Sequence, residues 1–98
     1  MATELGDVGT EFQYENEHAR VWSLILEPGE ASPWHHHTMH YFFIVTEAGT
    51  LRAEYHDNTS RERGYTLGEV VTGQKDSVHR VINVGTVRYS NAIIELKH

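Results

Sequence analysis

The 98-residue sequence contains no cysteine, and this absence excludes disulfide bridges, thiolate metal ligands and a cysteine nucleophile. Basic residues are also few. Eight Lys and Arg stand against 14 Asp and Glu, so the formal charge is 8 − 14 = −6. An acidic chain whose few basic residues are scattered repels phosphate backbones, so we expect no nucleic-acid partner.

Long apolar runs are missing as well. No window approaches the roughly 18 apolar residues of a membrane span, and the start, MATELGDVGTEF, lacks the basic and apolar regions of a secretion signal. We therefore expect no membrane partner and, by default, a cytoplasmic location. Without cysteine, the sequence does not report on the redox compartment.

Helical periodicity is absent too, because apolar residues nowhere keep a 3.6-residue period for three turns. The clearest predicted strands are 19–26, 41–46, 51–55, 78–83 and 88–96. Short strands with glycine at the corners predict an all-β fold, and a chain of this length forms one domain, residues 19–98. The polar residues 1–18 predict an N-terminal arm or an edge strand. Residues 56–64 (HDNTSRERG) predict a surface loop or the tip of a hairpin, without a role in the chemistry.

Histidine is abundant, with four of its eight copies at positions 35, 36, 37 and 40. On an extended strand alternate side chains share a face, so His35 and His37 point the same way. A metal site needs at least one more ligand, and His79, which lies in the apolar strand VHRVIN, is the best candidate. Three imidazoles suit iron, manganese, nickel, copper or zinc and leave positions for water or substrate. The alternative interpretation is a solvated histidine run with no designed site.

The spacing of these histidines resembles the two motifs of the cupin superfamily, G-x5-H-x-H-x4-E-x6-G and G-x5-P-x-G-x2-H-x3-N. The matching positions are Gly29, His35, His37, Gly49, Gly68, His79 and Asn83. The stretch PWHHH, followed by Tyr41, is similar to small single-domain cupins that include proteins named for β-alanine degradation. The resemblance implies a double-stranded β-helix (jelly-roll) barrel with His35, His37 and His79 as ligands of one divalent transition metal.

The sequence departs from the family pattern at two places. Counted back from Gly49, the motif glutamate falls on Phe42, so the resemblance implies a site with three histidines and no carboxylate. In the second motif, Gln74 and Asp76 replace the proline and the glycine. Aspartate adopts a glycine-like φ more readily than most residues, so we expect this turn to survive.

Residues near the histidines carry further expectations. The parity of the missing glutamate predicts that Phe42, Ile44 and Thr46 line the cavity together with Val81. His40 has three interpretations: a fourth ligand, a base beside the ligands or at the cavity mouth, or a surface residue. Tyr41 either turns its hydroxyl toward the metal or packs. An outward apolar row of Tyr41, Phe43 and Val45 predicts a homodimer, because such a patch is too large to leave wet.

Three kinds of function are compatible with the sequence. A three-histidine centre keeps the full charge of the metal, which favours a small anionic molecule that carries a carboxylate. It would suit an enzyme that uses Fe(II) and oxygen, or Lewis-acid isomerisation or hydrolysis. The second possibility is a non-catalytic module that binds a small molecule or metal and modulates another enzyme. The third is a barrel whose histidines bind metal only incidentally.

Overall fold

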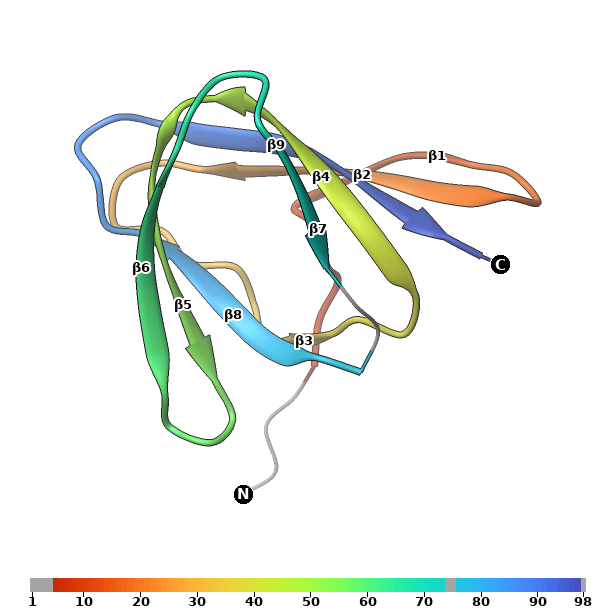
Figure 1. Ribbon diagram of the computed structural model, residues 1–98, viewed down its shortest axis with the longest axis horizontal. Helices are drawn as coiled ribbons and strands as arrows, with labels where there is room; N and C mark the ends of the chain where they lie inside the picture. Colours follow the sequence, from red (N-terminus) through yellow and green to blue (C-terminus); the bar gives the residue numbers. More distant parts are fainter. Residues whose placement is uncertain (1–4, 74–75, 98) are drawn as a thin grey trace.

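The computed structural model describes residues 5–73 and 76–97, and the described part of the chain is built of nine β-strands without a helix (Figure 1). The strands are β1 (Glu11–Glu15), β2 (Ala19–Leu26), β3 (His35–His36), β4 (His40–Glu47), β5 (Gly49–Tyr55), β6 (Ser60–Tyr65), β7 (Val70–Gly73), β8 (Val78–Asn83) and β9 (Tyr89–Leu96). The predicted all-β class is confirmed. None of the described residues belongs to a helix that could cross a membrane.

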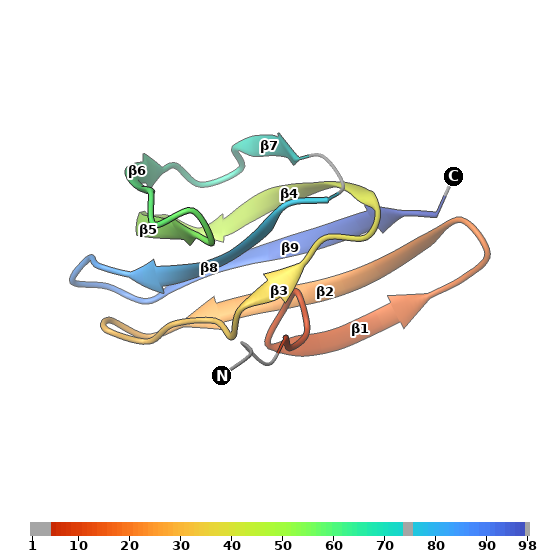
Figure 2. The ribbon, with the colours of Figure 1, turned by 90° about the horizontal axis from the view of Figure 1, so that it is seen from below.

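The strands form two antiparallel sheets that face each other (Figures 1 and 2). The five-stranded sheet has the order β1-β2-β9-β4-β7, and the four-stranded sheet has the order β3-β8-β5-β6. From β2 onward, the chain crosses to the other sheet at every connection except β5 to β6, so strands distant in sequence become neighbours. This alternation is the topology of a double-stranded β-helix, or jelly roll.

The core forms where alternating apolar residues of both sheets face inward. Leu24 and Leu26 on β2, Val45 on β4 and Tyr89 on β9 are at most 3% exposed, and Leu51 on β5 meets them from the other sheet. Each such side chain contributes roughly 2 kcal/mol by leaving water. Leu26 pairs with Tyr89 at one end of the five-stranded sheet, so the most buried residues close that end of the barrel.

A β-bulge in β4 corrects the predicted orientation of this strand. The register between β4 and β9 shifts between Val45 and Glu47, which adds one residue to β4. The predicted orientation was counted back from Gly49 without this extra residue, so every earlier side chain of β4 was assigned to the wrong face of the sheet. The face of Tyr41, Phe43 and Val45 therefore points inward, where it contacts the core. The prediction of these three residues as an outward row was wrong.

The charged stretch after β5 is part of a hairpin, as one of its two interpretations predicted, but the tip is shorter than expected. Only 56–59 form the turn, while Ser60–Tyr65 form β6, which pairs with β5 along its length. This edge strand carries polar side chains on both faces, so it lacks the apolar alternation by which strands are recognised. Charged edge strands of this kind resist pairing with other chains.

The N-terminal segment contributes an edge strand and part of the core. β1 pairs with β2, and before it the Gly6 backbone N–H donates a hydrogen bond to the Trp34 carbonyl at 2.7 Å. Val8 is 7% exposed and belongs to the core cluster. The segment before β1 is therefore held against the barrel at both ends.

Candidate metal centre

Strand pairing brings the three motif histidines together, although 42 residues separate His37 from His79. His35 on β3 lies directly opposite His79 on β8. The pairing continues beyond β3, where the His37 N–H donates to the Ser77 carbonyl at 2.9 Å and the Asp76 N–H donates to the His37 carbonyl at 2.6 Å. Alternation along the first strand and register with the second therefore place all three imidazoles on the inner face.

Asp76 adopts the conformation that the motif assigns to glycine. Its φ is +75°, in the left-handed region that aspartate tolerates better than most residues. Its side chain lies 3.5 Å from His36, which points away from the other histidines. The expectation that this turn survives without the motif glycine is thus met at Asp76, while Gln74, at the proline position, lies outside the described residues.

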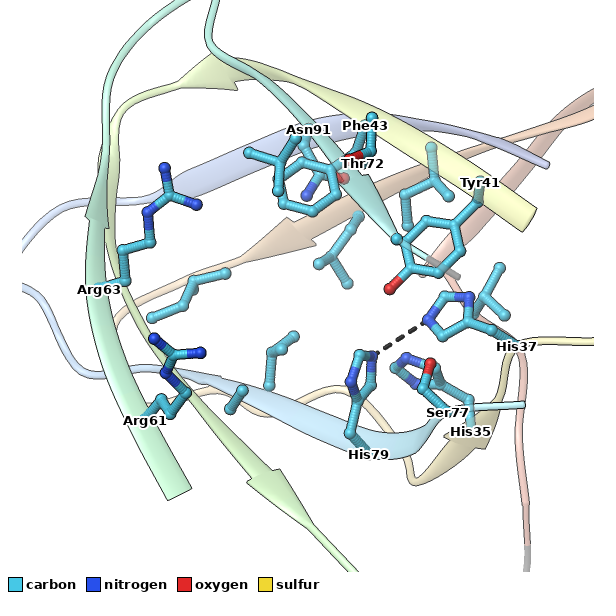
Figure 3. Close-up of a pocket in the computed structure, with 18 of the residues that line it drawn as sticks. His35, His37, Tyr41, Phe43, Arg61, Arg63, Thr72, Ser77, His79 and Asn91 are labelled. Carbon is cyan, nitrogen blue, oxygen red and sulfur yellow. Dashed lines mark hydrogen bonds between the residues drawn. The ribbon is translucent and has the colours of Figure 1, made fainter. Parts of the chain in front are cut away.

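The three imidazoles converge on one point at the wall of a pocket (Figure 3). One ring nitrogen from each of His35, His37 and His79 lies within 4.8 Å of the others. The Nε2 atoms of His37 and His79 are 3.1 Å apart. The ring centroids are 4.7–4.9 Å apart and the rings are nearly perpendicular, with interplanar angles of 79–88°. The rings of His37 and His79 thus approach each other through their Nε2 atoms.

Burial keeps the cluster neutral. Desolvation, together with the neighbouring histidines, lowers the pKa of His37 to about 3. Desolvation and the charge of His35 lower the pKa of His79 to about 4. Burial also lowers the pKa of His35, while its hydrogen bond to the Pro33 carbonyl acts in the opposite direction. Neutral imidazole is the form that binds metals, so the cluster is in its ligand state at pH 7.

The donor set fits a divalent transition metal. His35 Nδ1 donates to the Pro33 carbonyl at 2.9 Å, which leaves Nε2 unprotonated and fixes the ring orientation. The 3.1 Å between the other two Nε2 atoms lies within the roughly 2.9–3.4 Å expected between two nitrogens that bind one ion at about 2.1 Å. The widest separation in the group, 4.8 Å, requires a small rotation of a ring for all three to bind the same ion. The 3.1 Å contact shows that His37 and His79 face each other through Nε2, while the Nδ1 atom of each ring is buried without a hydrogen-bond partner.

Tyr41 adds a phenol beside this cluster. Its ring stacks on His37 with the centroids 3.7 Å apart and an angle of 13° between the planes. Its hydroxyl forms a hydrogen bond with the Ser77 side chain, and burial raises its pKa, so it stays protonated. A Cβ atom at Gly73 would overlap the Tyr41 ring, so glycine at this position on β7 makes room for the stack. Tyr41 therefore packs on one of the grouped histidines, and its hydroxyl lies on the side of the ring toward the cluster (Figure 3).

Other residues around the motifs lie apart from the cluster. His40 is exposed at the start of β4, opposite Leu96, and is not one of the three grouped histidines. Trp34 contacts His56, with ring centroids 4.9 Å apart, and the guanidinium of Arg80. Asn83, the last position of the second motif, holds a turn.

The hydrogen bonds of Asn83 show how it does so. Its side chain is 1% exposed and donates to the Leu26 and Val87 carbonyls, each at 2.9 Å, while its Oδ1 accepts from the Gly85 N–H at 2.9 Å. All three bonds go to backbone groups at the closed end of the barrel, two of them in the loop between β8 and β9 and one at the last residue of β2. The motif asparagine therefore serves the fold rather than the cluster.

The pocket has a volume of about 700 Å³ and lies between the two sheets. Its walls combine apolar residues, such as Leu24, Phe43 and Val81, with Asn91 and the histidine cluster. Val81 lines the pocket, as expected. Among the described residues Phe42, Ile44 and Thr46 are not part of its lining, and this part of the prediction was wrong because the bulge turns them outward.

Sequence reasoning missed two groups of lining residues. Arg61 and Arg63 on β6 face the pocket from the side opposite the histidines (Figure 3). Asn91 on β9 is 3% exposed and donates to the Tyr89 hydroxyl at 2.7 Å, while its Oδ1 has no hydrogen-bond partner. Arg61 and Arg63 alternate with Glu62, a pattern compatible with a strand, but the turn-forming residues around them favour a loop or a hairpin tip.

The chain belongs to the cupin family, because the family profile described as "Cupin domain" matches residues 22–92. No curated protein sequence matches it at a significant level. The family assignment and the observed topology agree with the fold expected from the motif spacing.

Solved structures share the fold. A cupin domain from Bordetella pertussis Tohama I is 28% identical and superposes with a TM-score of 0.83 over 100% of both chains. An RmlC-like cupin from Methanocaldococcus jannaschii is 17% identical, with a TM-score of 0.67 over 95% of this chain and 94% of that one. A cupin-2 domain protein from Shewanella frigidimarina is 21% identical, with a TM-score of 0.61 over 94% and 85%.

Proposed function

We propose that this cupin binds one divalent transition metal ion through His35, His37 and His79, and that a small carboxylate-bearing molecule binds at the metal inside the pocket. The observation that carries the proposal is the convergence of three neutral imidazole nitrogens, within 4.8 Å of one another, on the wall of that pocket. Candidate ions are Fe, Mn, Ni, Zn and Cu, because nitrogen donors suit each of them.

When bound, such an ion supplies Lewis-acid chemistry or, if it is iron, manganese or copper, redox chemistry. The residues of the chain supply the surroundings. The three ligands are neutral, so the centre keeps its charge and attracts an anion. The protonated hydroxyl of Tyr41 lies beside the cluster and can donate a hydrogen bond to an oxygen of the ligand. Apolar walls such as Phe43 and Val81 exclude water from the ligand's carbon chain.

A non-catalytic binding module is the second candidate, and one observation favours it. The carboxylates of the pocket lining, within the described ranges, are those of Glu62 and Asp76, and both residues are exposed. Glu62 lies 3.9 Å from Arg52, and Asp76 lies 3.5 Å from His36. Neither is a buried general base, so the site offers hydrogen-bond donors more readily than a proton acceptor.

Metal analysis and turnover assays separate the two candidates. The protein should be purified without a nickel column and then loaded anaerobically with Fe(II), Mn(II), Ni(II), Zn(II) or Cu(II). We expect metal-dependent binding of small carboxylates in both cases. Oxygen uptake or chemical conversion across a panel of small acids supports an enzyme, whereas tight binding without conversion supports the module. If carboxylates bind equally well after the metal is removed, the proposed function is wrong.

A further inference from the structure

Almost every basic side chain in the described part of the chain is paired with a carboxylate. The pairs are Arg20 with Glu15 and Glu95, Arg52 with Glu54, Arg63 with Glu69, Arg80 with Glu54, Arg88 with Glu47, and Lys97 with Glu15. Arg61 is the exception, because no ion pair or hydrogen bond of its side chain occurs among the described residues. Arg61 is exposed on an edge strand, and in a chain with a net charge of −6 it is the one arginine of the described ranges without a carboxylate partner.

The unpaired arginine faces the pocket that contains the histidine cluster. Arg61 on β6 lies directly opposite Ala53 on β5, and Ala53 lies opposite Val81 on β8. Residues directly opposite in antiparallel strands share a face, so this row points into the pocket, which all three residues line. His79 is two residues from Val81 on the same strand and therefore on the same face.

The arginine and the histidines are separated by a distance that a small molecule spans. Neighbouring strands are about 4.8 Å apart, so the backbones of β6 and β8 are about 10 Å apart at this row. The residue between them is Ala53, whose small side chain leaves the space above β5 open. Figure 3 places Arg61 across the pocket from the histidine cluster, on the side that His79 faces.

Arg63 provides a contrast on the same strand. It faces the pocket two residues further along β6, but its guanidinium contacts the Glu69 carboxylate and lies 4.6 Å from the centroid of the Tyr65 ring. Its charge is therefore neutralised within the protein. Of the two pocket-facing arginines, only Arg61 keeps its donors available for a ligand, and a guanidinium matches a carboxylate in charge and in its two-point geometry.

We propose that Arg61 binds a second carboxylate of the ligand, so that the pocket takes a small dicarboxylate with one end at the metal and the other at Arg61. The inference rests on the proposed function, because the first carboxylate binds at the three-histidine centre. It goes further in assigning the ligand two anionic ends and in naming the residue that selects for the second.

Calorimetric titration of the metal-loaded protein tests this assignment. The probes are succinate, glutarate and adipate, each compared with the monocarboxylate of the same carbon number, namely butyrate, pentanoate and hexanoate. We expect at least one dicarboxylate to bind about 10- to 100-fold more tightly than its monocarboxylate, since a hydrogen-bonded charge pair contributes on that scale. Arg61→Gln should abolish this preference, because it weakens the binding of the dicarboxylate far more than that of the monocarboxylate.

Arg63→Gln is the matched control, because it removes the same charge from the same face of the same strand and should keep the preference. Circular dichroism melts of both variants verify folding. Suppose that carboxylates bind in a metal-dependent way. If Arg61→Gln then keeps the preference for dicarboxylates, or if Arg63→Gln loses that preference equally, this inference is wrong while the proposed function stands. Failure of the wild type to bind any of the six acids in a metal-dependent way overturns it together with the proposed function.

Discussion

The ring of Tyr41 lies flat on the imidazole of His37, with the centroids 3.7 Å apart and the planes 13° from parallel. The Nδ1 atom of His37 has no hydrogen-bond partner, so the stack fixes the orientation of this ring. The ring of His35 is instead oriented by the hydrogen bond from its Nδ1 to the Pro33 carbonyl. Tyr41 thus orients His37 by packing, as a hydrogen bond orients His35.

Removal of the Tyr41 ring should therefore weaken metal binding. We expect Tyr41→Ala to lower the metal affinity about tenfold, as loss of a group that orients a ligand does, and Tyr41→Phe to leave it near the wild-type value. Competition with a chromophoric chelator measures both affinities. Gly73→Ala should resemble Tyr41→Ala, because its Cβ would displace the ring. Wild-type affinity in Tyr41→Ala would show that the stack has no orienting role.

The hydrogen bonds of Asn83 predict a loss of stability without a loss of metal. The side chain is 1% exposed and makes three bonds to backbone groups. Asn83→Ala should lower the free energy of unfolding by about 2–4 kcal/mol, since buried backbone groups lose their partners. Urea denaturation measures this, with exposed Thr86→Ala as the control, expected within about 0.5 kcal/mol of the wild type. A stable Asn83→Ala that no longer binds metal would contradict the structural role.

The lowered pKa values predict a pH dependence of stability in the metal-free protein. His37 and His79 have pKa values of about 3 and about 4 when folded, below the ordinary value of 6.5. Between these limits the unfolded chain binds more protons, so stability falls as the pH drops below about 6.5. We expect a loss of roughly 1 kcal/mol per pH unit for each histidine between pH 6 and pH 4.5.

Urea titrations at several pH values measure that slope. The pKa values of Glu15 and Glu47 are also lowered, chiefly by hydrogen bonds to Lys97 and Ser90 respectively. These carboxylates affect stability below about pH 4.5, so the change between pH 6.5 and pH 4.5 reports on the histidines. His79→Asn should reduce the slope, and His36→Gln should retain it. A stability that is constant from pH 6.5 to pH 4.5 would contradict the burial of the cluster.

The homodimer expected from the sequence requires a different surface from the one first predicted. Because β4 is inverted by its bulge, Phe42 and Ile44 face outward and pair with Ile94 and Ala92 on β9. We propose that a second copy of the chain covers this half-exposed apolar face. Sedimentation should then give about 22 kDa for the wild type, twice the 11.2 kDa chain, and about 11 kDa for Ile44→Lys. A wild-type monomer at micromolar concentration would refute the dimer.

The grouping of the histidines could be predicted from the sequence for two reasons, a local rule and the resemblance to the cupin motifs. Alternation places His35 and His37 on one face, and the motif spacing selects His79, which the structure pairs with His35. The turn at Asp76 was predictable for the same reason, since its backbone conformation depends on the residue type.

The lining of the pocket was not predictable in the same way. A single extra residue between Val45 and Glu47 inverts the face of every earlier residue of β4, and no local sequence signal marks this bulge. Arg61 was assigned to a loop because a charged edge strand lacks the apolar alternation of a buried one. Its role depends on partners two strands away, which only the register reveals.

The central claim is that three neutral imidazoles form one metal site, and metal stoichiometry tests it most directly. Protein purified without a nickel column and loaded with each candidate ion should contain about one ion per chain by elemental analysis. His35→Ala, His37→Ala and His79→Ala should each lower this occupancy well below one, whereas His36→Ala and His40→Ala should retain it. Stoichiometric metal in a triple variant that lacks His35, His37 and His79, or no stoichiometric metal in the wild type, would contradict the account.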